Sequence, residues 1–410
     1  MNRTIDKLSF EDIKKAAKDF DGAIKHTPTN HSITLSKITG ADVYIKLENR
    51  QFTASFKERG ALNKLLNLTP EQQKKGVIAA SAGNHAQGVA YHGSRLGIPT
   101  TIAMPLGTPF VKISNTEALG AEVIQVGERF DETAEAALKI AKDRELTVVH
   151  PFDDFHVMAG QGTIAIEFLE DFPDIDILLV PVGGGGLIAG IATAAKAIKP
   201  DIKVIGVQSE RFPSLYRAFN DEDYIAQGST LAEGIAVKTI GKRTVEICKD
   251  VVDDVLLVGE EEIEKALGML LTLEKTVSEG AGACPLAALI RYPDMFRGKK
   301  VGLVVTGGNI DTRLLASILM RSLVRDGRIT RLRIELPDIP GALSIISSII
   351  GNKGGNIIDV SHHRLFTELP AKETYSNITL ETRDAQHLQD ILEELREDGF
   401  VVNVNRNIDM

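Results

Sequence analysis

Short apolar runs rich in β-branched residues alternate with segments of helical spacing from about residue 40 to residue 325. The runs predict strands at residues 43–47, 77–80, 100–104, 122–126, 147–149, 177–182, 203–207 and 300–305. Between them, segments such as 84–96, 133–141 and 263–273 have the periodicity of helices. Because alternating strands and helices need crossover connections, this pattern predicts a doubly wound α/β body with parallel sheets. A ligand is expected beyond the carboxyl ends of the strands.

The pattern changes after the polar stretch 325–328. Residues 331–336, 356–362, 374–381 and 400–404 have strand patterns, and residues 341–352 and 386–396 have helical ones. The resulting order, βαββαβ, is that of a ferredoxin-like unit. We therefore predict two domains, at residues 1–325 and 329–410.

Residues 177–195 carry no charge and approach the length of a membrane span. Pro181 and four adjacent glycines interrupt this run, which disfavours a spanning helix. A buried parallel strand followed by a buried helix produces the same composition without lipid. We predict that second arrangement, and no membrane partner.

Composition narrows the class of protein. The 410 residues carry a net charge of -9, which disfavours nucleic-acid binding because that requires a basic face. Cys248 and Cys284 cannot form a disulfide framework, and the sequence has no Cys/His cluster of zinc-site spacing. Residues 1–20 contain charges such as Lys7 and Glu11 instead of an apolar stretch, so the expected location is the cytoplasm.

The glycine run Gly183, Gly184, Gly185, Gly186 lies between a predicted strand and a predicted helix. Backbone amides without Cβ atoms can converge there on an anion, and the helix adds its positive end. Leu187 and Ile188 exclude a Walker loop, which needs Gly-Lys-Ser/Thr at this point. The spacing leaves open a simple tight turn, a dinucleotide fingerprint ending at Ala189, or another phosphate site.

The segment Ser55-Phe56-Lys57-Glu58-Arg59-Gly60 resembles an element of the fold-type II pyridoxal-phosphate enzymes, especially the threonine and serine dehydratases. The resemblance implies that Lys57 is the Schiff-base residue and that Phe56 contacts the cofactor. The glycine run together with Leu187 then matches the loop that holds the cofactor phosphate. An isolated lysine is usually a solvated surface charge, but Lys57 lies at a predicted helix start, where a cation is unfavourable.

Two further segments extend the resemblance. Ser81-Ala82-Gly83-Asn84-His85 joins a strand to a helix, and the resemblance implies that Ser81, Gly83, Asn84 and His85 bind the substrate, with Asn84 also beside the pyridine ring. Thr306, in a Thr-Gly-Gly turn, matches the partner of the pyridine nitrogen. A hydroxyl there stabilises a pyridinium less than a carboxylate does, which favours elimination over transamination.

Some residues depart from the family pattern or carry little weight. Glu58 replaces a usual apolar residue, and Gln208 replaces the carboxylate that binds a metal in serine-racemase-like members. We therefore predict no required metal, although Glu210 is close in sequence. Segments 233–236 and 279–282 are similar to family segments near the cofactor, but a glutamate outside a clear motif is usually solvated.

The C-terminal domain is similar to an ACT domain at residues 336–343 and 355–358. The resemblance implies an amino-acid effector bound near Pro340, Gly341, Ala342, Leu343 and Asn356 where two domains meet. A dimerisation module without ligand remains an alternative. His362 and His363 cannot easily share a metal, because neighbouring side chains on a strand point to opposite faces.

Taken together, the resemblance covers nearly the whole chain and implies pyridoxal 5'-phosphate as cofactor. Lys57 would remove the Cα proton and the cofactor phosphate would act as acid, converting threonine to 2-oxobutanoate and ammonia. Serine would give pyruvate, because one methyl group is worth only about 1–3 kcal/mol. Alternatives are a serine racemase using Ser81 as second base, a nicotinamide-dependent oxidoreductase, or an amino-acid sensor. A homo-oligomer, dimer or tetramer, is expected.

Overall fold

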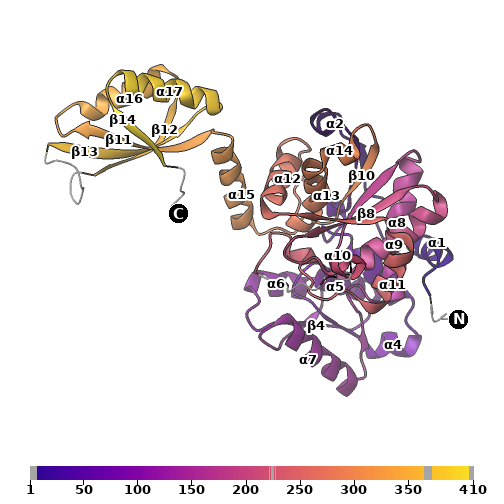
Figure 1. Cartoon of the computed structure of the whole chain (residues 1–410). Helices are drawn as coiled ribbons and strands as arrows, with labels where there is room; N and C mark the ends of the chain where they lie inside the picture. Colours follow the sequence, from indigo (N-terminus) through magenta and orange to yellow (C-terminus); the bar gives the residue numbers. More distant parts are fainter. Residues whose placement is uncertain (1–6, 221, 223–225, 227, 364–371, 406–410) are drawn as a thin grey trace. The chain divides into compact units, whose positions relative to one another are not determined.

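The computed structural model describes residues 7–220, 222, 226, 228–363 and 372–405. The chain divides into two compact units, Met1–Ile310 and Asp311–Met410 (Figure 1). This division places α15 (Thr312–Arg325) in the second unit. The domain boundary between residues 325 and 329 therefore stays a prediction.

The larger sheet of the first unit has the order β1-β2-β10-β7-β8-β9. Its strands are β1 (Thr29–His31), β2 (Asp42–Leu47), β10 (Lys300–Val305), β7 (Ile177–Pro181), β8 (Lys203–Ser209) and β9 (Asp254–Val258). All neighbours pair in parallel except β1 and β2. Every residue of β7 is buried, as two covered faces require.

Helices cover both faces of this sheet. One layer contains α1 (Phe10–Asp19), α8 (Phe155–Asp171), α9 (Gly186–Ile198) and α11 (Lys242–Val251). The other contains α12 (Glu260–Thr272) and α13 (Gly280–Arg291). Short helices α2 (Ile33–Thr39), α10 (Ser214–Asn220) and α14 (Pro293–Phe296), with the 3-10 turns η1 (Glu48–Arg50) and η2 (Glu233–Ile235), complete the lobe.

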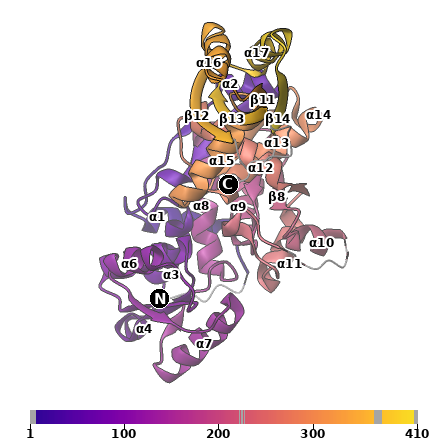
Figure 2. The ribbon, with the colours of Figure 1, turned by 90° about the vertical axis from the view of Figure 1, so that its left-hand side faces the viewer.

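The smaller sheet has the parallel order β5-β4-β3-β6. Its strands are β5 (Glu122–Gln125), β4 (Thr100–Met104), β3 (Val77–Ala80) and β6 (Thr147–Val148), and its helices are α3 (Lys57–Leu66), α4 (Pro70–Lys75), α5 (Asn84–Leu96), α6 (Phe110–Ala118) and α7 (Phe130–Asp143). Helices α3 and α5 share one apolar core with the sheet, and α7 packs on its other face. In both views, α4 and α7 lie at the opposite end of the unit from α13 and α14 (Figures 1 and 2).

The second unit contains the antiparallel sheet β12-β13-β11-β14. Its strands are β11 (Ile329–Pro337), β12 (Asn356–His363), β13 (Glu373–Glu381) and β14 (Val401–Asn405), and its helices are α16 (Ala342–Asn352) and α17 (Ala385–Glu397). Leu332, Ile334 and Leu336 alternate along β11 and join the apolar core with both helices. The predicted βαββαβ order is confirmed.

The predicted strands are confirmed to within two residues at each end, but two observed strands were not predicted. Strand β1 is a short polar edge strand that pairs antiparallel through its backbone, so it has no apolar pattern to recognise. Strand β9 lies at the other edge of the same sheet and keeps partly exposed residues. The predicted parallel sheets are confirmed, and β1 adds an antiparallel strand at one edge of the larger sheet.

The uncharged run 177–195 forms β7, the glycine turn and most of α9, as predicted. Within the described ranges, no helix combines the length and the apolar character needed to cross a membrane.

Candidate active site

Lys57 is the first residue of α3, where the sequence places it. Its Nζ donates to the carbonyl oxygen of Pro151 at 2.9 Å and lies 5.1 Å from the ring centroid of Phe56. Burial lowers the pKa of Lys57 to about 8, although the nearby Glu279 carboxylate opposes that shift. The amine can therefore lose its proton close to neutral pH.

The chain segment before Lys57 is joined to the segment that contains Thr306. Ser55 forms an antiparallel bridge with Gly307, and the Phe56 amide donates to the Thr306 carbonyl oxygen at 3.0 Å. Thr306 itself is buried. These contacts bring the predicted Schiff-base lysine and the predicted partner of the pyridine nitrogen to one place.

Asn84 begins α5 and faces the carboxylate of Glu279, a residue that carried little weight in the sequence analysis. Its Nδ2 donates to both carboxylate oxygens of Glu279, at 2.8 and 3.0 Å, and its Oδ1 accepts from Asn309 Nδ2 at 2.6 Å. Burial raises the pKa of Glu279 to about 7, outweighing Asn84 and Lys57, which favour the ionised form. The expectation of a solvated glutamate is therefore wrong. The available signal was its place directly before the uncharged first turns of α13.

His85 is a neutral, buried imidazole. Its Nε2 donates to the Val149 carbonyl oxygen at 2.8 Å, which leaves Nδ1 as the unprotonated nitrogen. Burial, reinforced by the charge of Lys57, lowers the pKa of His85 to about 3. Within the described part of the chain, Nδ1 has no hydrogen-bond partner.

The turn before α5 is built to present backbone amides. Ser81 Oγ accepts from the Gly83 amide at 3.2 Å, which shapes the turn. Among the residues that the structure describes, none accepts a hydrogen bond from the amides of Asn84, His85 or Ala86. Three free amides at a helix N-terminus fit a carboxylate.

The glycine run forms a second group of free amides at the start of α9. Within the described residues, the amides of Gly183, Gly184, Gly185, Gly186 and Leu187 have no acceptor. Gly185 caps the helix with φ +91°, a conformation that costs a non-glycine residue about 1–2 kcal/mol. A Cβ at Gly184 would overlap the ring of Phe152, so the loop is packed from behind while its amides stay available.

Residues 149–154 connect these parts, and the sequence analysis missed them. His150 Nδ1 accepts from the amides of Phe152 and Asp153, at 3.3 and 2.8 Å, which shapes the segment. Two carbonyl oxygens of the segment accept hydrogen bonds: that of Pro151 from Lys57, and that of Val149 from His85. The Phe152 ring packs against the glycine run. A proline followed by a helix-capping aspartate before α8 was the available signal.

Arg59, two residues after Lys57, anchors α3 through a buried charge network. It is fully buried and bonds Glu48 at 2.8 Å and Glu167 at 2.6 Å. Burial opposes its charge, but the two carboxylates raise the pKa of Arg59, so it remains a cation. Lys46 also contacts Glu167, at 2.7 Å. The network ties α3 to η1 and α8.

Gln208 joins the end of β7 to the start of α10 through its side-chain hydrogen bonds. Its Nε2 donates to the Val182 carbonyl oxygen at 3.1 Å, and its Oε1 accepts the amides of Leu215 and Tyr216 at the start of α10. In the described ranges, no group of three His, Cys, Asp or Glu residues could hold a metal ion. The predicted lack of a required metal stays a prediction. Cys248 and Cys284 are free and buried, as expected.

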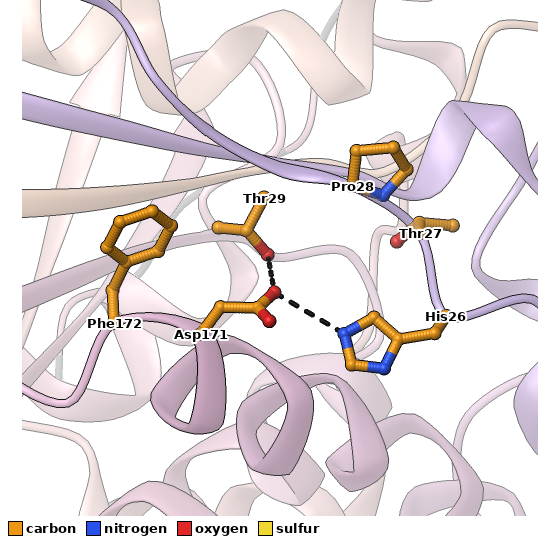
Figure 3. Close-up of a pocket in the computed structure, with 6 residues that line it drawn as sticks. All are labelled: His26, Thr27, Pro28, Thr29, Asp171 and Phe172. Atoms are coloured by element: carbon orange, nitrogen blue, oxygen red, sulfur yellow. Dashed lines mark hydrogen bonds and ion pairs between the residues drawn. The ribbon is translucent and has the colours of Figure 1, made fainter.

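A separate pocket of about 310 Å³ is lined by His26, Thr27, Pro28, Thr29, Asp171 and Phe172. None of the predicted site residues lines it. Asp171 already accepts from Thr29 Oγ1 at 2.6 Å and faces His26 Nε2 at 3.4 Å (Figure 3). Its carboxylate is thus bonded within the pocket wall, and we assign the pocket no part in the site.

The predicted effector residues lie in the second unit. Gly341 has φ +91° and caps α16, Ala342 is buried, and Leu343 is half-buried. Pro340 and Asn356 are exposed, and Asn356 Nδ2 lies 3.4 Å from Glu381 Oε2. His362 bonds Ser376 while His363 stacks on Tyr375, so the two histidines use different partners, as expected for a strand.

The residues of the first unit fit pyridoxal phosphate. Lys57 offers an amine of lowered pKa for an aldehyde, the glycine run offers amides for a phosphate, and the start of α5 offers amides for a substrate carboxylate. When bound, the cofactor supplies an electron sink for bonds at the substrate Cα.

Comparisons with known proteins agree with this fit. Residues 20–307 match the family model of pyridoxal-phosphate dependent enzymes, and residues 326–406 match that of the ACT domain. L-threonine ammonia-lyase of Thermotoga maritima is 44% identical over 97% of this chain and 99% of its own length. Threonine deaminase isoform 2 of Solanum lycopersicum superposes with a TM-score of 0.73 at 34% identity, over 78% of this chain and 92% of that one.

Serine racemase of Dictyostelium discoideum superposes with a TM-score of 0.69 at 34% identity, over 74% of this chain and 99% of that one. The fold thus occurs in proteins named for more than one reaction. The near full-length identity and the additional ACT match separate this chain from that relative. The chain belongs to the threonine ammonia-lyase family of fold-type II pyridoxal-phosphate dependent enzymes, with a C-terminal ACT domain.

Proposed function

We propose that this protein deaminates L-threonine to 2-oxobutanoate and ammonia, and L-serine to pyruvate as a side activity. The observation that carries the proposal is that Lys57 and His85 both bond the segment 149–154, whose Phe152 packs against the glycine run. This segment links the lysine to two groups of free helix-terminal amides, which suit a phosphate and a carboxylate. The near full-length relatives named L-threonine ammonia-lyase support threonine as the substrate.

In this proposal, Lys57 is the general base. Its lowered pKa of about 8 lets Nζ accept the Cα proton near neutrality. Glu279, whose pKa is raised to about 7, holds Asn84 in place and can keep a proton within the site. The neutral His85 and the amides at the start of α5 orient the substrate carboxylate. Burial around Thr306 excludes water from that edge.

The test is turnover by the purified protein with L-threonine and with L-serine, measured as 2-oxo acid and ammonia release. Lys57→Ala should reduce turnover by about 1000-fold or more and remove the visible absorbance of the bound cofactor. Full turnover with retained absorbance in that variant would refute the assignment of Lys57. Tight NADH binding would instead revive the nicotinamide alternative.

Serine racemase is the second candidate, favoured by the superposition on a racemase and by Ser81 in the turn before α5. Chiral analysis of serine recovered after incubation distinguishes the two. Accumulation of D-serine that depends on Ser81 would favour the racemase.

We further propose that an amino acid regulates the enzyme through the ACT unit, bound by Pro340, Gly341, Ala342, Leu343 and Asn356 in a homo-oligomer. The exposed side chains of this group support a site completed by a second surface. Threonine turnover measured with and without isoleucine, alongside thermal denaturation, tests this. An amino acid that binds while no ammonia is released from threonine would favour a pure sensor.

A further inference from the structure

A buried pair of ionisable side chains lies directly behind the active-site lysine and has no part in the contacts described so far. Glu58 is 1% exposed and His92, on α5, is fully buried. Glu58 Oε2 lies 3.7 Å from His92 Nε2. A buried carboxylate next to a buried imidazole is costly to maintain unless each stabilises the other.

The two side chains have few other partners. Glu58 Oε1 accepts the backbone amide of Thr53. Among the described residues, neither ring nitrogen of His92 has a hydrogen-bond partner. The polar group that faces its Nε2 is the Glu58 carboxylate, at 3.7 Å. The tight packing of α5 on α3 enforces this pairing: a Cβ at Gly88, one turn before His92, would lie 3.2 Å from the Lys57 carbonyl carbon.

Thr53 connects Glu58 to the predicted active-site residues through hydrogen bonds. Its carbonyl oxygen accepts from Asn309 Nδ2 at 3.0 Å, and the same Nδ2 donates to Asn84 Oδ1 at 2.6 Å. The next residue, Ala54, has φ +56°, a conformation that a non-glycine residue keeps only where its surroundings fix it. The Ala54 carbonyl oxygen accepts the Gly308 amide at 2.9 Å. The Glu58 carboxylate is the buried anchor of this strained segment.

We propose that Glu58 and His92 are a positioning pair for the cofactor site. His92 keeps Glu58 in its buried place, Glu58 fixes the Thr53 amide, and the segment held there sets the positions of Lys57 and, through Asn309, of Asn84. Neither side chain touches the reacting atoms. The kinetic part of this inference rests on the proposed function, whereas the cofactor-binding part does not.

The experiment compares full-length Glu58→Leu/His92→Leu, Glu58→Gln and His92→Leu with the wild type, and uses the exposed Glu71→Gln as control. Replacing both members of a buried pair by apolar residues usually preserves folding, so the melting temperature of the double variant should stay within about 5 °C. Its Kd for pyridoxal phosphate, titrated by the visible absorbance of the bound cofactor, should rise about tenfold or more. Its kcat should fall by about 10- to 100-fold, with a smaller change in KM.

Glu58→Gln keeps an oxygen for the Thr53 amide, so its Kd for pyridoxal phosphate should stay within about threefold of wild type. His92→Leu removes the partner of the carboxylate and should weaken cofactor binding more than Glu58→Gln does. The proposal is overturned if the double variant or His92→Leu binds cofactor with wild-type affinity and spectrum, or if Glu58→Gln is as impaired as the double variant. Absence of threonine turnover in the wild type would refute the proposed function, while the order of cofactor affinities would still test the pair.

Discussion

Two helices of this protein begin with the same glycine conformation in very different surroundings. Gly185 caps α9 with φ +91° and ψ -8°, and Gly341 caps α16 with φ +91° and ψ -12°. A Cβ on Gly185 would lie 2.9 Å from Thr244, whereas a Cβ on Gly341 would meet nothing within 4 Å among the described residues. The local backbone is the same, but only the first helix start is enclosed.

This difference indicates how complete each site is within one unit. At α9, Phe152 and Thr244 pack behind the loop, and Thr244 Oγ1 donates to the Gly184 carbonyl oxygen at 2.8 Å. At α16, the surroundings are open and carry exposed apolar side chains, such as Ile345 at 52% and Ile358 at 53% exposure. The residues predicted to bind the cofactor thus all belong to the first unit. We expect the effector site to need a second surface.

The largest expected effect comes from the buried charge network that anchors α3. Arg59→Met leaves Glu48 buried without its salt-bridge partner and leaves Glu167 with Lys46 alone, and should lower the free energy of unfolding of the first unit by about 3–5 kcal/mol. Denaturant unfolding monitored by circular dichroism measures it. Arg297 pairs with Asp294 on the surface, so Arg297→Met should lower the free energy of unfolding by less than about 1 kcal/mol. Equal losses in the two variants would show that the buried network does not anchor α3.

The matched variants Gly185→Ala and Gly341→Ala test most directly whether the two helix starts differ in function. Both add a Cβ at φ +91°, so both should lose about 1–2 kcal/mol of stability. Only Gly185→Ala also crowds Thr244 and displaces the cradle amides, so its Kd for pyridoxal phosphate should rise about 10- to 100-fold. Titration of cofactor absorbance measures both variants. Weakened cofactor binding by Gly341→Ala would contradict the separation of the two sites.

The enclosed site should also make the stability of the cofactor-free protein depend on pH in a specific way. The pKa of Glu279 rises from 4.5 to about 7 on folding because burial disfavours its charge. The folded state therefore binds the proton more tightly, and this stabilisation is full below pH 4.5 and is lost as the pH rises through 7. Relative to Glu279→Gln, the free energy of unfolding of the wild type should fall by about 1–3 kcal/mol as the pH rises from 4.5 to above 7. Parallel curves of unfolding free energy against pH for the two proteins would refute this; the exposed Glu71→Gln is the control.

The smallest effect on stability belongs to the open site. Ile358→Thr replaces a half-exposed residue of β12 and should change the free energy of unfolding by less than about 0.5 kcal/mol. If this edge is covered by a second copy, the same change should weaken self-association about tenfold, measured by analytical ultracentrifugation. Val401→Thr, on the opposite edge strand β14, is the matched control. Unchanged association in Ile358→Thr would place the contact elsewhere.

Much of the fold was predictable because its signals are local. The helix over residues 84–96 and the strands at 77–80, 100–104 and 300–305 have the predicted bounds, since apolar periodicity and glycine turns mark them. Lys57, Asn84 and Thr306 were predicted as site residues from their motifs, and the structure brings their segments together. Strand β1 was missed because a polar edge strand is held by backbone pairing alone.

Other parts depended on contacts between distant residues. Glu279 looked like a solvated glutamate, yet α5 places Asn84 against it across 195 positions of sequence. Phe152 carries no motif, and its importance comes from filling the space that Gly184 leaves. The pairing of Glu58 with His92 depends on the packing of α3 on α5, which no spacing reveals.

The sequence by itself determined the two kinds of α/β architecture, because these follow from periodicity. It indicated the cofactor class and the lysine through the resemblance of short motifs to a known family. The tertiary structure alone decided which charges are buried and therefore which pKa values shift, since burial depends on neighbours far apart along the chain. It also decided that one glycine-capped helix start is enclosed and the other open. Local sequence sets the backbone, and packing determines what the backbone can bind.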